Sequence, residues 1–136
     1  MDWRTWAYDR LRLDASILTD VPETSIFGAG SLSGSPQARP FIVLRFGAET
    51  VELVDGDKPA ATSHRMTVYA HDKPGDYLRV ARILRNVRTL LAGNVTGMAP
   101  GNGIMAVWEG DSGDLADDLF QTVVRYGEYR LIGKVA

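Results

Sequence analysis

HRMTVYAHDKPGDYLRVARILRNVRTLL, residues 64–91, changes its hydrophobic period part-way along its length. Between His64 and His71 every second residue is apolar, which is typical of a β-strand with one buried face. After Asp76 the apolar residues recur three or four positions apart, which is typical of an amphipathic α-helix. This apolar arc comprises Tyr77, Val80, Ile83, Leu84, Val87, Leu90 and Leu91. The stretch therefore predicts a strand that leads into a long helix.

Residues that favour helix ends flank the predicted helix. Pro74 suits a first helical turn, and Asp72 is a candidate cap close to it. Asp76 places a favourable negative charge in the first turn. At the other end, Gly93 suits a helix stop.

Four arginines, Arg79, Arg82, Arg85 and Arg88, are spaced three residues apart on this helix. Each helical residue advances about 100°, so successive arginines move about 60° backwards around the axis. The guanidinium groups therefore cover the outer surface and do not form one row. Three interpretations remain open: a solvated helix face, a protein interface, in which arginine is enriched, or a phosphate-binding surface.

Before residue 64 the sequence predicts a helix, a loop and a long hairpin. Residues 3–18 carry a broad apolar face, which predicts an amphipathic helix. A short apolar piece (25–27) precedes a Gly- and Ser-rich stretch (28–38), which we expect to be a flexible loop. FIVLRF (41–46) is apolar on both alternating faces, as in a central strand covered on both sides. The turn signal Asp55-Gly56 predicts that this strand and the next extend into a hairpin.

After residue 91 the sequence predicts two more strands, over 104–110 and within 120–136. Gly127 is a candidate bulge in the second of these. The predicted fold class is α+β, with a mostly antiparallel sheet of four to five strands. We expect an N-terminal helix and one long helix packed on one face of the sheet, and a long hairpin between strands 2 and 3.

Composition limits the classes of function. The chain has 136 residues, 45% of them hydrophobic, and a formal net charge of −2. These values predict a single domain over residues 1–136 and argue against a dedicated nucleic-acid binder, which usually carries a basic excess. The absence of cysteine excludes disulfides, thiolate metal sites and cysteine nucleophiles. We expect a soluble cytoplasmic protein, because the N-terminus is unlike a signal peptide and no apolar run approaches the ~20 residues of a membrane span.

Signals for catalysis or metal binding are weak. His64 and His71 would face opposite sides of one strand, so they cannot form a local metal pair. GAGSLSG (28–34) matches neither the dinucleotide fingerprint nor a nucleophile elbow. The aspartates between residues 111 and 118 could bind a hard cation, but their spacing favours a solvated acidic loop. We therefore expect a protein that is not an enzyme and has no catalytic residue, metal or cofactor.

Four segments together resemble the tail terminator or tail-completion family of long-tailed bacteriophages. They are the strand from Pro40 to Phe46, the strand from His64 to His71, the helix from Tyr77 to Leu91, and the final strand from Thr122 to Leu131. The resemblance covers most of residues 3–135. Two segments, 28–37 and 94–103, are longer than the family pattern predicts.

The resemblance implies a structural virion protein, a tail terminator that forms a ring, typically a homohexamer, on the end of the tail tube. Such a ring stops tube polymerisation and joins the tail to a head-tail connector or head-closure protein. Its place is the head-tail junction at the head-proximal end of the tail, after assembly in the host cytoplasm, with no membrane contact. DNA would pass through the lumen with only transient contacts. The alternatives are another head-tail neck or minor tail protein, and a small ligand-binding α+β module.

A closed ring brings two different patches of neighbouring subunits together, and opposite charges on those patches would fix their register. We therefore expect acids and arginines to pair across a subunit boundary, and polar segments 28–38 and 48–62 to order against the tube or connector. The predicted interface residues are Arg79, Arg82, Arg85, Arg88, Glu49, Glu52, Asp55, Asp57, Lys58, Asp111 and Asp114.

Overall fold

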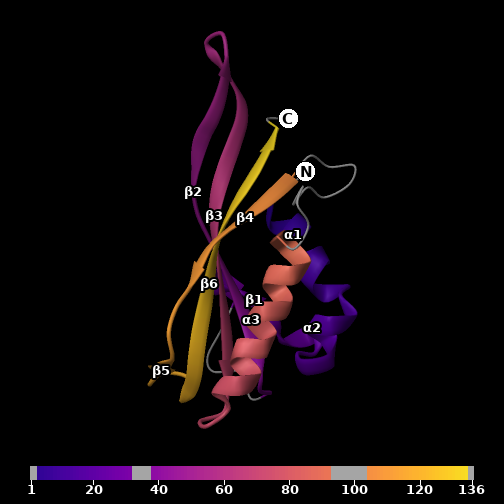
Figure 1. Ribbon diagram of the computed structural model, residues 1–136, viewed down its shortest axis with the longest axis vertical. Helices are drawn as coiled ribbons and strands as arrows, with labels where there is room; N and C mark the ends of the chain where they lie inside the picture. The colour runs from indigo at the N-terminus through magenta and orange to yellow at the C-terminus, as the bar shows by residue number, and fades with distance from the viewer. Residues whose placement is uncertain (1–2, 32–37, 93–103, 135–136) are drawn as a thin grey trace.

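The computed structural model describes residues 3–31, 38–92 and 104–134. Its helices and strands, in chain order, are α1 (Trp3–Arg12), α2 (Ala15–Asp20), β1 (Ile26–Gly28), β2 (Phe41–Asp55), β3 (Lys58–Asp72), α3 (Tyr77–Ala92), β4 (Ile104–Asp111), β5 (Leu115–Asp117) and β6 (Thr122–Lys134). The three helices gather on one side of a single sheet (Figure 1). None of the described helices is long and apolar enough to cross a membrane.

The sheet has six strands in the order β1-β2-β3-β6-β4, with β5 paired to β6. Among the described strands, only β1 and β2 form a parallel pair, so the predicted α+β fold with a mostly antiparallel sheet is confirmed. Four to five strands were predicted because β1 and β5 have three residues each, too few to show an alternating pattern. The stretch 28–38 also differs from a plain loop, since Gly28 ends β1 and a 3-10 turn covers Ala29–Ser31.

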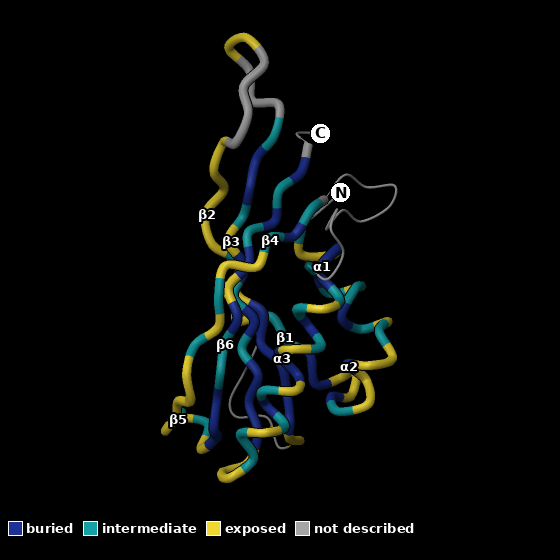
Figure 2. The backbone as a smooth tube through the Cα atoms, viewed as in Figure 1, coloured by how far each residue is buried: buried dark blue, intermediate teal, exposed yellow. Residues whose placement is uncertain are grey.

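The long hairpin formed by β2 and β3 is confirmed. Its strands pair from Phe41 opposite His71 to Asp55 opposite Lys58, and Gly56 adopts the left-handed φ of 67° that the turn requires. The hairpin extends beyond the rest of the sheet (Figure 1), and the described part of the outer strand is exposed there (Figure 2). This end of the molecule is therefore a projecting arm.

The core lies between the helices and one sheet face. From the sheet it includes Ile42, Leu44, Met66, Val68, Ala70, Tyr129 and Leu131, and from α3 it includes Val80, Ile83, Leu84, Val87 and Leu91. Met66, Val68 and Ala70 are the alternating residues predicted for β3, and the α3 residues belong to the predicted apolar arc. Each large one contributes roughly 1.5–3 kcal/mol by leaving water.

The single N-terminal helix predicted over 3–18 is wrong, because the chain breaks into α1 and α2 around Leu13 and Asp14. The Asp14 carboxylate accepts a hydrogen bond from the Ile17 backbone N–H at 3.0 Å and caps α2. Leu13 is 82% exposed at the break. The cap lets Leu11 and Ile17 both reach the core although the helix axis changes direction.

The predicted start of the long helix is also wrong in detail. Pro74 and Gly75 form a turn before α3, which begins at Tyr77. Asp72 does not cap the helix, because its carboxylate accepts hydrogen bonds from the Lys73 backbone N–H and from Arg79. The predicted stop at Gly93 and the segment 94–103 lie outside the described residues.

Gly127 is not a bulge. β6 pairs with β3 through Gly127 without a shift, and the irregularity lies in β4 between Trp108 and Gly110. A Cβ atom at Gly127 would lie 2.8 Å from Asp111 Oδ1. The glycine is therefore explained by the close approach of the Asp111 side chain.

Candidate assembly surfaces

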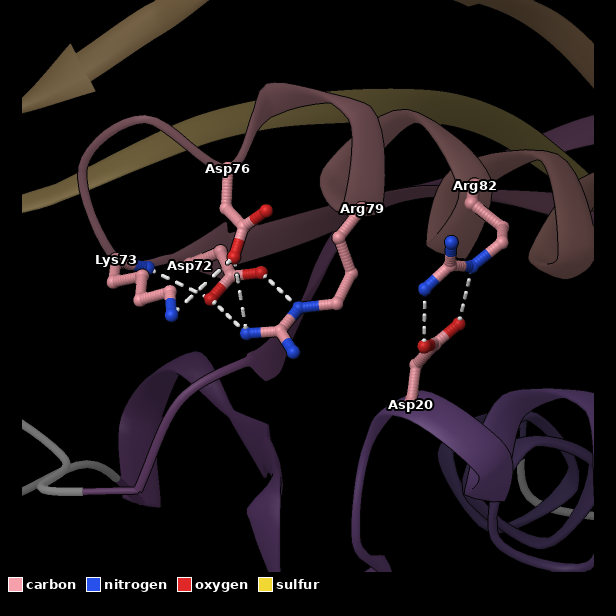
Figure 3. Close-up of polar contacts among 6 residues, drawn as sticks. All are labelled: Asp20, Asp72, Lys73, Asp76, Arg79 and Arg82. Carbon is pink, nitrogen blue, oxygen red and sulfur yellow. Dashed lines mark hydrogen bonds and ion pairs between the residues drawn. The ribbon is translucent and has the colours of Figure 1, made fainter.

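Arg79 is tied to its own chain. Its Nε donates to Asp72 Oδ2 at 2.5 Å and its Nη2 donates to Asp72 Oδ1 at 2.7 Å (Figure 3). The Asp72 side chain is fully buried, and Asp76 lies 3.4 Å from Arg79 Nη2. The hydrogen bonds to Asp72 raise the pKa of Arg79 above its ordinary value. This bidentate pair fixes the start of α3 to the end of β3.

Arg82 also has a partner within the chain. Its Nε and Nη2 donate to the two Asp20 oxygens at 3.0 and 2.6 Å, which links α3 to the end of α2 (Figure 3). The hydrogen bond from Arg82 lowers the pKa of Asp20, and the same bond raises the pKa of Arg82. Sequence reasoning could not find this pair, because the two residues are 62 positions apart.

The last two arginines of the set differ in environment. The Arg88 guanidinium lies over the Trp108 ring at 4.5 Å from its centroid, a cation–π contact with β4. Arg85 is exposed and makes no ion pair with any other described residue. Of the four arginines predicted to lie in an interface, Arg85 is therefore the one that remains available to a partner.

Several of the predicted interface acids are likewise engaged within the chain. Glu49 Oε2 lies 3.0 Å from His64 Nε2. Asp111 accepts a hydrogen bond from Trp108 Nε1 at 2.9 Å, and Asp114 is ion-paired with Arg125. Asp57 is exposed at the hairpin turn. The side chains of Glu52, Asp55 and Lys58 lie outside what the structure describes.

The two histidines lie on opposite faces of the sheet, as their spacing predicts. His64 packs on the Trp3 ring of α1 with a centroid distance of 4.8 Å. His71 stacks on Phe41 on the other face, at 4.6 Å and an interplanar angle of 7°, and its Nδ1 shares a 2.8 Å hydrogen bond with Thr122 Oγ1. Burial lowers the pKa of His71 to about 4, so its ring is neutral at pH 7.

The helix-free face of the sheet holds a shallow hollow of about 290 Å³. Its walls include Val43, Tyr69, His71, Phe120, Val124 and Tyr126. Phe41 and Val43 are buried beside it, so this part of β2 is covered on both sides, as predicted. The hollow combines aromatic rings with a neutral histidine, one carboxylate, Asp117, and one guanidinium, Arg45. Among the described residues no group of three His, Cys, Asp or Glu side chains could hold a metal ion.

Several solved structures are similar to this chain, and two of them match nearly its whole length. One comes from the particle described as the virion of a native gene transfer agent, and it superposes with a TM-score of 0.69 at 15% identity, covering 95% of this chain and 92% of that chain. The second, whose name carries no functional description, gives a TM-score of 0.56 at 15% identity and covers 93% of this chain and 92% of its own. No protein-family model and no curated protein sequence matches the chain. The similarity is therefore one of fold, and it extends over nearly the whole of each chain.

Proposed function

We propose that this protein is a structural component of a phage-like virion and acts as a tail terminator. In this proposal it forms a ring, typically a homohexamer, that caps the tail tube, stops its polymerisation and joins it to the head connector. The observation that carries the proposal is the fold shared with a chain of the gene transfer agent virion over 95% of this chain. The sequence pattern of strand, helix and closing strand supports the finer role.

The architecture suits subunit assembly. β4 stands at one end of the strand order, and β1 covers only residues 42–44 of β2, so the described sheet keeps strand edges that another subunit could approach. The projecting arm supplies a segment that reaches beyond the body (Figure 1). A closed ring requires two such different surfaces on each subunit.

The partners in this proposal are other copies of the chain, the tail tube protein and a connector or head-closure protein. Of the α3 arginines, Arg85 is the one proposed to pair with an acid across a subunit boundary. Arg79 and Arg82 serve the monomer, because each binds a carboxylate of its own chain. DNA passes through the lumen, and a chain of net charge −2 favours weak contact with its phosphates.

Tube length is the direct test of the terminator role. Purified tail tube protein would be polymerised with and without this protein, and tube lengths and ends would be recorded by electron microscopy. We expect short tubes that end in a ring. A variant without residues 55–60 should fold normally but no longer cap, whereas Arg85→Glu should weaken capping.

Unchanged tube lengths and bare ends with the wild-type protein would contradict the terminator role. Labelling of the protein in intact particles would then separate the remaining virion roles. Label at the head-tail junction without capping activity would indicate another neck protein, and label along the tail would indicate a minor tail protein.

A further inference from the structure

Three arginines lie on the helix-free face, at the hairpin side of the aromatic hollow, and one of them, Arg45, lines the hollow. Arg45 on β2, Arg65 on β3 and Arg130 on β6 all alternate with core residues, so they point away from the helices. Arg65 lies directly opposite Arg130 in the β3–β6 register, and Arg45 lies opposite Thr67, one diagonal step from Arg65. We call Arg45, Arg65 and Arg130 the arginine patch.

The patch is electrostatically costly within one subunit. Like charges directly opposite each other on antiparallel strands are destabilising. The register places Glu128 on the same face, and Arg130 interacts within its own chain, so the charges left over are those of Arg45 and Arg65. Arg45 and Arg65 are exposed, and neither forms an ion pair with a described residue.

The backbone leaves the central arginine open. The β2–β3 register shifts between Phe46 and Glu49, and a Cβ atom at Gly47 would lie 3.2 Å from the Arg65 Cβ. Arg65 therefore has Gly47 of β2 as its neighbour on one side and Arg130 of β6 as its neighbour on the other. The β2 residue in close contact with Arg65 has no side chain, and Arg65 is exposed.

We propose that the arginine patch is the docking site for the acidic hairpin end of a second copy of this chain. The hairpin end carries three acids, Glu52, Asp55 and Asp57, and one lysine, Lys58, so its net charge of −2 complements the patch. This inference rests on the proposed ring, and it identifies the two surfaces that meet in it. The arm of one subunit lies across the helix-free face of the next.

The hairpin cannot reach the patch of its own subunit. Residues 58–65 of β3 form a continuous strand, so the turn stands roughly 23 Å from Arg65 along the sheet. Figure 1 shows the arm continuing away from the body and not folding back over the sheet. A hairpin end that docks on the patch must therefore come from another copy.

A nucleic acid is the competing occupant, and the surface favours it less. Tyr69 and Tyr126 pack against each other at a centroid distance of 5.5 Å and are half-buried, so they do not offer the open stacking platform typical of single-strand binders. Glu128 would repel phosphates within the patch, and the whole chain is acidic.

The test is a charge swap. One variant carries Arg45→Glu and Arg65→Glu, a second carries Asp55→Lys and Asp57→Lys, and a third carries all four changes. Rings would be measured by native mass and by counting capped tube ends. Each two-residue variant should lower the ring fraction at least about tenfold, since like charges then meet across the interface. The four-residue variant should recover rings, because the reversed patch meets a reversed hairpin.

Lys73→Glu is the matched control, because Lys73 is exposed in the turn before α3, far from the hairpin end (Figures 1 and 3). Circular dichroism must show that every variant folds. The inference would be overturned if the two-residue variants still formed rings, or if a folded four-residue variant did not recover them. Capping by the wild-type protein would still support the proposed function in either case. The wild-type protein would also be tested for binding to duplex and single-stranded oligonucleotides. If Arg45→Glu/Arg65→Glu abolished such binding and left rings unaffected, the patch would be assigned to nucleic acid.

Discussion

Removal of the Arg79 guanidinium should cost more stability than any other single arginine change on α3. The Asp72 side chain is fully buried, and both of its oxygens accept hydrogen bonds from Arg79. Breaking a buried ion pair on one side typically costs 3–5 kcal/mol, because a carboxylate is left uncompensated. The Arg79 side chain is 28% exposed, which lets water replace part of the lost interaction. We therefore expect Arg79→Gln to lower the free energy of unfolding by about 3 kcal/mol.

Urea and thermal denaturation would measure this change. For a chain of this length, about 3 kcal/mol corresponds to a fall in Tm of roughly 10 °C. Arg85→Gln is the matched control, and it should change stability by no more than about 0.5 kcal/mol because Arg85 is exposed without an ion pair to a described residue. Arg79→Lys should be intermediate, since it keeps the charge but loses the bidentate geometry.

A double-mutant cycle separates the pair from the packing around it. Asp72→Asn combined with Arg79→Gln should cost clearly less than the sum of the single changes, because the double variant leaves no buried charge. Two single changes that simply add, or an Arg79→Gln variant as stable as Arg85→Gln, would refute the reasoning.

Three further changes test other parts of the fold. The pKa of His71 falls from its ordinary 6.5 to about 4 on folding, so the unfolded chain binds more protons between these values and stability falls as pH drops through that window. From pH 7 to pH 5 we expect His71 to account for a loss of about 2 kcal/mol, which His71→Phe should abolish in urea titrations at both pH values; an unchanged pH slope would contradict this. The Tyr129 hydroxyl is buried without a hydrogen-bond partner in the described part of the chain, so Tyr129→Phe should leave Tm unchanged or raise stability by up to about 1 kcal/mol. A loss of stability in that variant would reveal a partner for the hydroxyl. Gly127→Ala should cost about 1–3 kcal/mol in thermal unfolding, because its methyl would meet the Asp111 carboxylate. Adding Asp111→Ala should relieve that loss, and a cost that persists would place the clash elsewhere.

Long periodic segments made the framework of the fold predictable. β2, β3, α3 and β6 each have thirteen to sixteen residues, enough to show a period of two or of three to four. The three-residue strands β1 and β5 show no period, and their pairing depends on neighbours that local sequence does not reveal. The break before α2 did carry a signal, since Asp14 stands three residues before a helical N–H that it caps.

The candidate surfaces were less predictable, because they depend on contacts between distant segments. The arginine spacing on α3 was visible in sequence, but the acids that neutralise Arg79 and Arg82 come from β3 and α2. The arginine patch required the register of three strands, although the alternation around Arg65 already placed that residue away from the core. Sequence therefore identified the charged residues, and only the fold separated those that hold the monomer together from those left for a partner.

Native mass spectrometry of the protein, alone and mixed with purified tail tubes, tests the central claim most directly. A terminator should give a closed ring of identical subunits, either free in solution or as one ring on each tube end. A protein that stays monomeric or dimeric and does not associate with tube ends would contradict the account.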